Sequence, residues 1–296
     1  PIVSFEKLQE YAISISRFAN SWQSINNSNN LLVQRILRLN NSMHIKLFLC
    51  AVYEKKQTLE EFEKILDLVE KIEFRNRIFV FTMDDRVFAE YARDLYSSVS
   101  LSAISKELQE KIDSMPITEA ILDSNLSNAF SGLYEFERGN KGFHRWPTLK
   151  YLLFEYEHHL KEEMGEAFDK VPYDSFDNTD IEHIIPQNYA ANWKSEAEDF
   201  LCGFKTEELR RMGEKVLINT LGNLTILKES KNRSLQDNPW NTTELLSGKK
   251  DRYSTGSYNE IEISKNQIWT KTEIKKRGEK IFTFIVKEKL GFQGII

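Results

Sequence analysis

The stretch "DIEHIIPQN" (residues 180–188) decides how the fold of this chain is interpreted. Its β-branched isoleucines are typical of a strand, and Pro186 cannot donate to a strand ladder, so it should end the strand. An acid, Glu182, stands directly before His183, a residue type whose pKa lies near neutrality. A histidine on such a strand is more often a core residue with a structural partner. The nine residues alone therefore permit both a catalytic strand and an ordinary buried strand.

Two later stretches supply elements that a catalytic strand would need. "LINTLGNLTIL" (residues 217–227) predicts a turn at Gly222 and a second short strand over 223–227. "SKNRSLQDN" (residues 230–238) predicts a short helix. The order is strand, insertion, strand, short helix, which predicts a ββα unit at about 180–237.

The first part of the chain, residues 1–144, reads as an all-helical bundle. "TLEEFEKILDLVEKI" begins with a capping box from Thr58 to Glu61 and continues with the apolar stripe of a helix packed on one face. Asp84 and Ser102 are expected N-caps of two later helices. No residues of this region have a spacing typical of a catalytic motif, and the sequence does not indicate what the region does.

The second part, residues 145–296, is predicted to be an α+β domain that contains the ββα unit. A helix is expected over roughly 147–168, and a basic final helix should stop at Gly291. "TGSYNEIEIS" (residues 255–264) reads as a loop with an edge strand. The predicted fold class is mainly α, with a helical bundle followed by this α+β domain.

Composition narrows the class of protein. An apolar fraction of 41% indicates a folded globular chain, and two cysteines are too few for a structural zinc site. No apolar run approaches the ~20 residues of a membrane helix, and no signal peptide is present, so we expect a cytoplasmic protein without a membrane partner. The chain opens at Pro1, already inside an amphipathic helical pattern, which suggests a fragment whose N-terminal partner domain is missing.

Charge is distributed unevenly along the chain. The net charge is −5, yet residues 203–296 carry 18 Lys and Arg against 12 Asp and Glu. A basic C-terminal third could meet phosphate, although such an asymmetry also arises as chance surface charge.

The residue types around His183 suit phosphodiester hydrolysis, which needs a base to activate water and a cation to stabilise charge. His183 can be the base, and none of the five histidines follows it, so an amide must replace any further histidine ligand. Asn232 could offer an amide oxygen to Mg²⁺, and Asn223 could hydrogen-bond near His183 and fix its ring. Glu182 is a candidate metal ligand, and Asp180 competes with it because both lie on one strand face.

"IEHIIPQN", "LGNLTIL" and "KNRSL" together resemble the HNH, or ββα-metal, nuclease superfamily, and are especially similar to the C-terminal domain of GmrSD-type restriction endonucleases. The likeness covers roughly 145–290. It implies that Glu182 is the metal-ligand acid, His183 the general base, Asn223 the residue that supports the base, and Asn232 the metal-ligand amide. The gap of 40 residues between His183 and Asn223 is longer than in compact HNH units.

The resemblance also implies a substrate, a cofactor and partners. It implies cleavage or nicking of DNA with Mg²⁺, for which Mn²⁺ or another divalent cation could substitute, in phage defence or modification-dependent restriction. It implies an N-terminal nucleotide-binding or sensing domain as partner. The oligomeric state stays open. Alternatives are a non-catalytic DNA- or partner-binding module and an RNA-cleaving toxin. Six basic residues are candidates for phosphate contact: Lys231, Arg233, Lys249, Lys250, Arg252 and Arg277.

Overall fold

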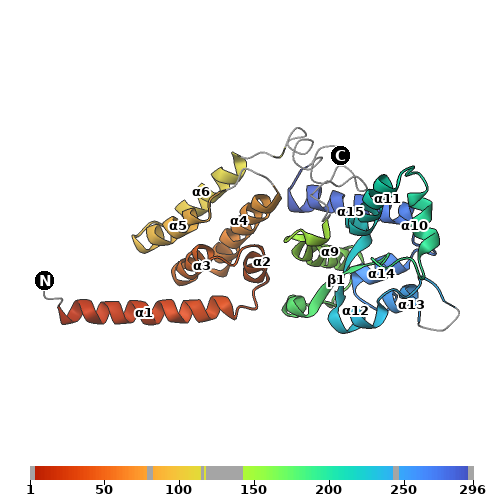
Figure 1. Ribbon diagram of the computed structural model, residues 1–296. Helices are drawn as coiled ribbons and strands as arrows, with labels where there is room; N and C mark the ends of the chain where they lie inside the picture. The colour runs from red at the N-terminus through yellow and green to blue at the C-terminus, as the bar shows by residue number, and fades with distance from the viewer. Residues whose placement is uncertain (1–3, 79–82, 115–116, 118–142, 243–246, 293–296) are drawn as a thin grey trace. The chain divides into compact units, whose positions relative to one another are not determined.

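A computed structural model describes the chain except residues 1–3, 79–82, 115–116, 118–142, 243–246 and 293–296. It divides into two compact units, Pro1–Ile117 and Thr118–Ile296 (Figure 1). The boundary predicted between residues 144 and 145 stays a prediction, because most of the chain between Ile117 and that point lies outside the described residues. No described helix is both long enough and apolar enough to cross a membrane.

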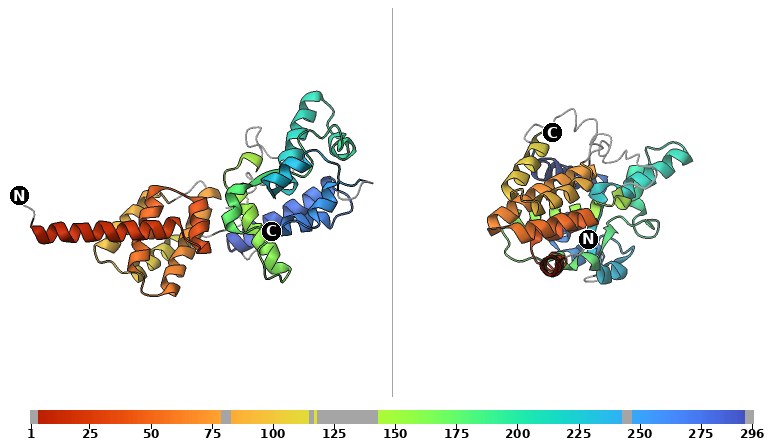
Figure 2. Two further views of the ribbon diagram at one scale, coloured as in Figure 1. Left: turned by 90° about the horizontal axis from the view of Figure 1, so that it is seen from below. Right: turned by 90° about the vertical axis from the view of Figure 1, so that its left-hand side faces the viewer.

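The first unit is helical, as the sequence predicts. Its core is formed by apolar side chains from every helix, with Phe48, Ile65 and Phe88 fully buried. Both Figures 1 and 2 show the first helix projecting beyond the others as one long rod. The helices are α1 (Phe5–Asn26), α2 (Leu31–Leu39), α3 (Met43–Lys55), α4 (Leu59–Ile78), α5 (Arg86–Tyr96) and α6 (Leu101–Asp113).

Helix caps in this unit differ in detail from the predicted ones. The Thr58 hydroxyl accepts from the Glu61 amide at 3.1 Å as expected, but the Glu61 carboxylate accepts from the backbone of Gln57 instead of closing back on Thr58. The N-cap of α6 is Ser100, not Ser102, since Ser100 is the serine with extended backbone before the first turn. At α5 the cap position is Asp85, one residue after the predicted Asp84.

The second unit is mixed, with a two-stranded sheet among helices. Its longer helix α9 (Leu149–Glu163) ends earlier than predicted, because Gly165 takes a left-handed backbone with φ of +67°. The last helix is stopped by Gly291, at φ +74°, as expected. The remaining elements are η2 (Phe143–Arg145), η3 (Tyr173–Asn178), β1 (Thr179–His183), α10 (Lys194–Leu201), α11 (Glu207–Asn219), η4 (Leu221–Asn223), β2 (Leu224–Lys228), α12 (Glu229–Leu235), α13 (Lys249–Tyr253), α14 (Tyr258–Ser264), α15 (Lys271–Phe284) and η5 (Ile285–Lys289).

The two strands pair antiparallel, in a register that places His183 opposite Leu224 and Thr179 opposite Lys228. Helix α12 follows β2 without a loop, and it lies beside the two strands (Figure 1). After the end of β1 the chain leaves the sheet. Its next residues, Ile184 and Ile185, are buried in a core together with Trp193 and apolar residues of α10, α11 and α15. The apolar tail of the opening stretch therefore anchors the end of β1.

One element was predicted wrongly. Residues 255–264 contain α14 instead of a loop with an edge strand. Ser257 and Glu260 form a capping box that starts this helix, and Asn259, in its first turn, is fully buried. The alternation in "NEIEIS" imitates a strand, but the cap and the contacts of α14 with α9 and α13 override it.

Candidate active site

Strand β1 presents acids on one face and the histidine on the other. Side chains alternate along a strand, so Asp180 and Glu182 share a face, while His183 points to the opposite face. His183 belongs to the last pair of the ladder. The structure thus brings the predicted base and acids to one short strand, but through two sides of the sheet.

His183 is held as a neutral base. Its side chain is buried, at 7% exposure, and its ring centroid lies 4.4 Å from that of His144 in η2. Burial, followed by the positive charge of His144, lowers the pKa of His183 to about 4. Its Nε2 lies 3.1 Å from Oδ1 of Asn219, at the end of α11. At neutral pH the imidazole therefore carries no charge and can accept a proton.

The contact with Asn219 also sets the tautomer of the ring. Nδ2 of Asn219 donates to the carbonyl of Lys215 at 3.0 Å, which leaves Oδ1 as the acceptor facing His183. Nε2 must then carry the proton, and the lone pair falls on Nδ1; this assignment follows from the hydrogen-bond network. Sequence reasoning missed Asn219. The available signal was a polar residue at the very end of an amphipathic helix, directly before the turn that leads to Asn223.

Asn223 acts on the backbone beside His183, not on its ring. It is fully buried, its Oδ1 accepts from the Ile185 amide at 2.8 Å, and its Nδ2 donates to the carbonyls of Ile185 and Ile218 at 3.0 Å each. The expected hydrogen bond to the imidazole is instead made by Asn219. Asn223 clips the chain just after β1 to the turn before β2, so it fixes where His183 leaves the strand.

On the other face, Glu182 is held by a buried lysine. Nζ of Lys249, on α13, lies 2.6 Å from Oε1 of Glu182 and also donates to the carbonyls of His183 and Ile184 at 3.0 and 3.1 Å. Lys249 has no exposed surface. Burial raises the pKa of Glu182 and lowers that of Lys249, each opposed by the partner's charge. All three ammonium donors are used on three consecutive residues of β1 and its exit.

Asp180 lies beside the predicted helix ligand. Nδ2 of Asn232, on α12, is 3.4 Å from Oδ2 of Asp180, and both side chains are half-buried. Within the described residues, two buried hydroxyls lack a hydrogen-bond partner: that of Thr225, which pairs with Glu182 in the ladder, and that of Tyr253, whose pKa is raised by burial and then by the charge of Glu182. Orphaned hydroxyls next to carboxylates indicate room for a water or cation that the protein atoms do not themselves replace.

The donor set of this face suits a hard cation. In the part of the chain that the structure describes, no three His, Cys, Asp or Glu residues converge as a metal cluster. Two carboxylates, Asp180 and Glu182, with the amide of Asn232 do lie on one side of β1 and α12. Mg²⁺ takes few protein oxygens and keeps several waters, so these three are the residues that could hold it.

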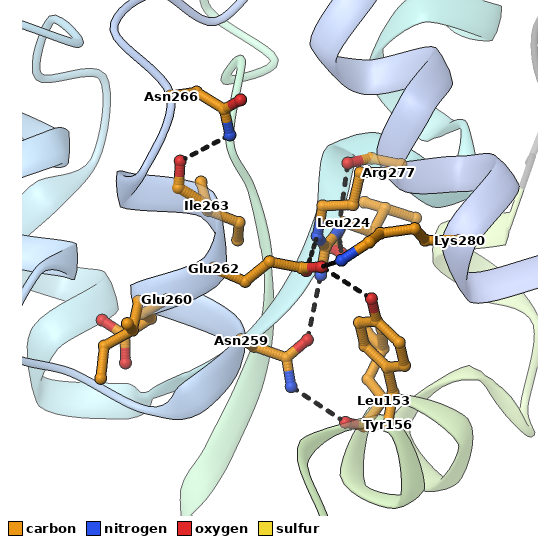
Figure 3. A network of polar contacts seen from close by, with 12 residues as sticks. Leu153, Tyr156, Leu224, Asn259, Glu260, Glu262, Ile263, Asn266, Arg277 and Lys280 are labelled. Carbon is orange, nitrogen blue, oxygen red and sulfur yellow. Dashed lines mark hydrogen bonds and ion pairs between the residues drawn. The ribbon is translucent and has the colours of Figure 1, made fainter. Parts of the chain in front are cut away.

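Two of the six basic residues predicted to contact phosphate are buried. Lys249 has the role given above. Arg277, at 4% exposure, donates to the carbonyls of Gly222 and Leu224 at 3.0 and 2.7 Å and to Asn259 at 3.0 Å (Figure 3). Both carry internal hydrogen bonds because their long side chains satisfy backbone oxygens at the strand ends. Neither faces a surface that DNA can reach in this structure.

The other four basic residues have accessible surface. Arg233 is 75% exposed and pairs with Glu229 one turn earlier. Lys231 pairs with Glu260 and is 18% exposed. Arg252 donates to Ser234 at 3.2 Å, and Lys250 to Gln267 at 2.6 Å. Their expected contact with DNA stays a prediction.

Comparison with known families places the second part of the chain in a family. Residues 127–284 match the family described as GmrSD restriction endonucleases, C-terminal domain. The match spans more than half of the chain, so the chain belongs to this family, and its function is related to that of a restriction endonuclease. No curated protein and no solved structure matches the chain significantly.

Proposed function

We propose that this chain is a Mg²⁺-dependent DNA endonuclease of the HNH type, with β1, β2 and α12 as its ββα-metal unit. The order of these elements, the antiparallel pairing of β1 with β2, the start of α12 directly after β2 and the family membership support the proposal. As the name of the family suggests, the biological setting we infer is restriction of incoming DNA in the cytoplasm, in phage defence. Recognition of the target would come from a further domain or from the helical unit.

The proposed chemistry begins at His183. Nε2 is occupied by Asn219, so Nδ1 takes the proton from a water that attacks the phosphorus of the scissile bond. Mg²⁺ or Mn²⁺, held by Asp180, Glu182 and Asn232, supplies stabilisation of the charge on the phosphate and on the leaving 3′ oxygen. Asn223 keeps the backbone beside the base in place. The resemblance to HNH nucleases implies products with a 5′ phosphate and a 3′ hydroxyl.

The single observation that carries the proposal is the preorganised histidine. His183 is held neutral by burial, and Asn219, whose amide donates to the Lys215 carbonyl, occupies Nε2 and leaves Nδ1 as the ring atom that can take a proton. A neutral, oriented imidazole is what a general base requires before substrate arrives.

The test is cleavage of supercoiled plasmid by the full chain with Mg²⁺ or Mn²⁺, beside His183→Ala. His159→Ala is the matched control, because His159 lies on α9, where it pairs with Glu163 and packs against Tyr156 and Phe284, none of which belongs to the proposed site. We expect the wild type and His159→Ala to nick or linearise the plasmid and His183→Ala to lose at least a hundredfold in rate. Equal cutting by His183→Ala removes it as the base. An intact plasmid with cleaved single-stranded RNA identifies a ribonuclease instead.

A further inference from the structure

A polar hollow lies at the end of the two-stranded sheet away from His183. It encloses about 320 Å³, and it is formed where the last residue of β2, the start of α12 and the turn before α14 meet. The lining side chains that matter here are Lys170, Lys228, Lys231, Thr255, Ser257 and Glu260.

The hollow carries an excess of positive charge. Three lysines line it against one carboxylate, and that carboxylate, Glu260, is already paired with Lys231. Lys170 and Lys228 are exposed and bond to no carboxylate in the described part of the chain. The Nζ atom of Lys170 instead lies 5.5 Å from the ring centroid of Tyr258, which tethers the side chain without neutralising it. Two positive charges therefore remain available to an anion.

The position of the hollow relates it to the proposed site. Lys228 pairs with Thr179, and His183 stands four residues farther along β1, a separation of about 13 Å at the rise of a strand. Lys231 and Asn232 are neighbours on α12, as are Thr179 and Asp180 on β1. The hollow and the proposed metal ligands thus use consecutive residues of the same two elements, within reach of a few nucleotides of one DNA strand.

We propose that this hollow binds a backbone phosphate of the DNA strand that flanks the bond to be cut, with Lys170 and Lys228 as the neutralising cations. The inference rests on the proposed nuclease function and adds to it a binding subsite outside the six predicted basic residues. The hydroxyl of Thr255, an exposed residue of the lining, suits a remaining phosphate oxygen. Because such contacts read no base, the subsite positions the strand without selecting its sequence.

The experiment measures how DNA affinity depends on salt. A phosphate contact releases counterions, so the logarithm of the binding constant falls as the logarithm of the salt concentration rises. Each lost contact makes this negative slope shallower by about 0.9 for duplex DNA. The full chain carrying His183→Ala is titrated with a labelled duplex in EDTA, which separates binding from cleavage. Lys170→Ala and Lys228→Ala are added singly and together. Lys205→Ala is the matched control, since Lys205 is exposed and far along the chain from the hollow.

We expect the double variant to make the negative slope shallower by about 1 to 2 and Lys205→Ala to leave it unchanged. Circular dichroism checks that each variant is folded. If the parent binds DNA and the double variant keeps its slope, the subsite is wrong while the nuclease proposal survives. If the parent binds no DNA, both proposals fail. If inorganic phosphate binds the parent and not the double variant, with the DNA slope unaltered, the hollow is a site for free phosphate and the DNA role is overturned.

Discussion

Replacing Lys249 by methionine should lower the stability of the second unit more than a substitution of an exposed residue near it. Methionine keeps the length of the side chain but removes the ammonium that serves Glu182 and the carbonyls of His183 and Ile184. Glu182 is only 7% exposed, so its carboxylate would be left buried without a partner. Breaking one side of a buried ion pair in this way costs about 3–5 kcal/mol.

That loss is large on the scale of the whole unit. Domains are stable by about 5–15 kcal/mol, and for a unit of this size 1 kcal/mol shifts Tm by about 2–4 °C. We therefore expect Lys249→Met to lower Tm by roughly 6–20 °C. Lys250→Met is the control. Lys250 is the next residue, its ammonium donates to exposed Gln267, and its replacement should cost less than about 1 kcal/mol.

The assay is urea unfolding followed by tryptophan fluorescence, because three tryptophans lie in or beside the core that α13 covers. A double-mutant cycle with Glu182→Gln isolates the pair, and the double variant should recover about 0.5–3 kcal/mol relative to the sum of the single changes. If Lys249→Met is as stable as Lys250→Met, the buried pair is not what holds β1. If it is stable but loses DNA affinity, the original prediction of a phosphate contact for Lys249 was right.

Three further predictions concern buried polar groups. The pKa of His183 is about 4 in the folded protein, against 6.5 in the unfolded chain. Its contribution to stability is therefore fully present above pH 6.5 and is lost as the pH falls towards 4. In urea unfolding with EDTA, the free energy of unfolding of His183→Asn should change less with pH over that window than that of the wild type. Asn223→Ala leaves three buried backbone groups unpaired at about 1–3 kcal/mol each, so a thermal melt should detect partial or complete unfolding. Asn219→Ala should instead melt within a few degrees of the wild type, yet cut DNA at least tenfold more slowly. Burial raises the pKa of the Cys50 thiol to about 11, so a thiol reagent should label exposed Cys202 at once and Cys50 only after denaturation.

The sequence predicts what depends on local pattern. The β-branched run and Pro186 located β1, the turn at Gly222 located β2, and the short helix carrying Asn232 was placed within two residues of its observed start. Strand alternation also placed Asp180 and Glu182 on one face correctly. These features depend on residues a few positions apart, where propensity and periodicity are informative.

What the sequence does not predict is which distant side chain completes a buried polar group. Lys249 lies 67 residues from Glu182, and Asn219 lies 36 residues from His183. In sequence, a lysine after "SG" reads as a solvated charge, and only the packing of α13 under β1 turns it into a buried partner. Arg277 was misjudged for the same reason, since its burial follows from α15 crossing the turn at Gly222.

Glu182 and His183 lie on opposite faces of one strand, and one set of buried groups fixes the backbone that carries both. Lys249 donates hydrogen bonds to the carbonyls of His183 and Ile184 from the side of Glu182. Asn223, in the turn before β2, accepts a hydrogen bond from the backbone amide of Ile185. Each of the three residues after Glu182 is therefore fixed by a buried group. The direction in which His183 leaves the sheet is set by the same lysine that orients Glu182, so the two faces are tied to one piece of backbone. Of the two acids of the proposed metal site, Glu182 is already paired with Lys249, whereas Asp180 lies beside Asn232 and pairs with no lysine in the described part of the chain.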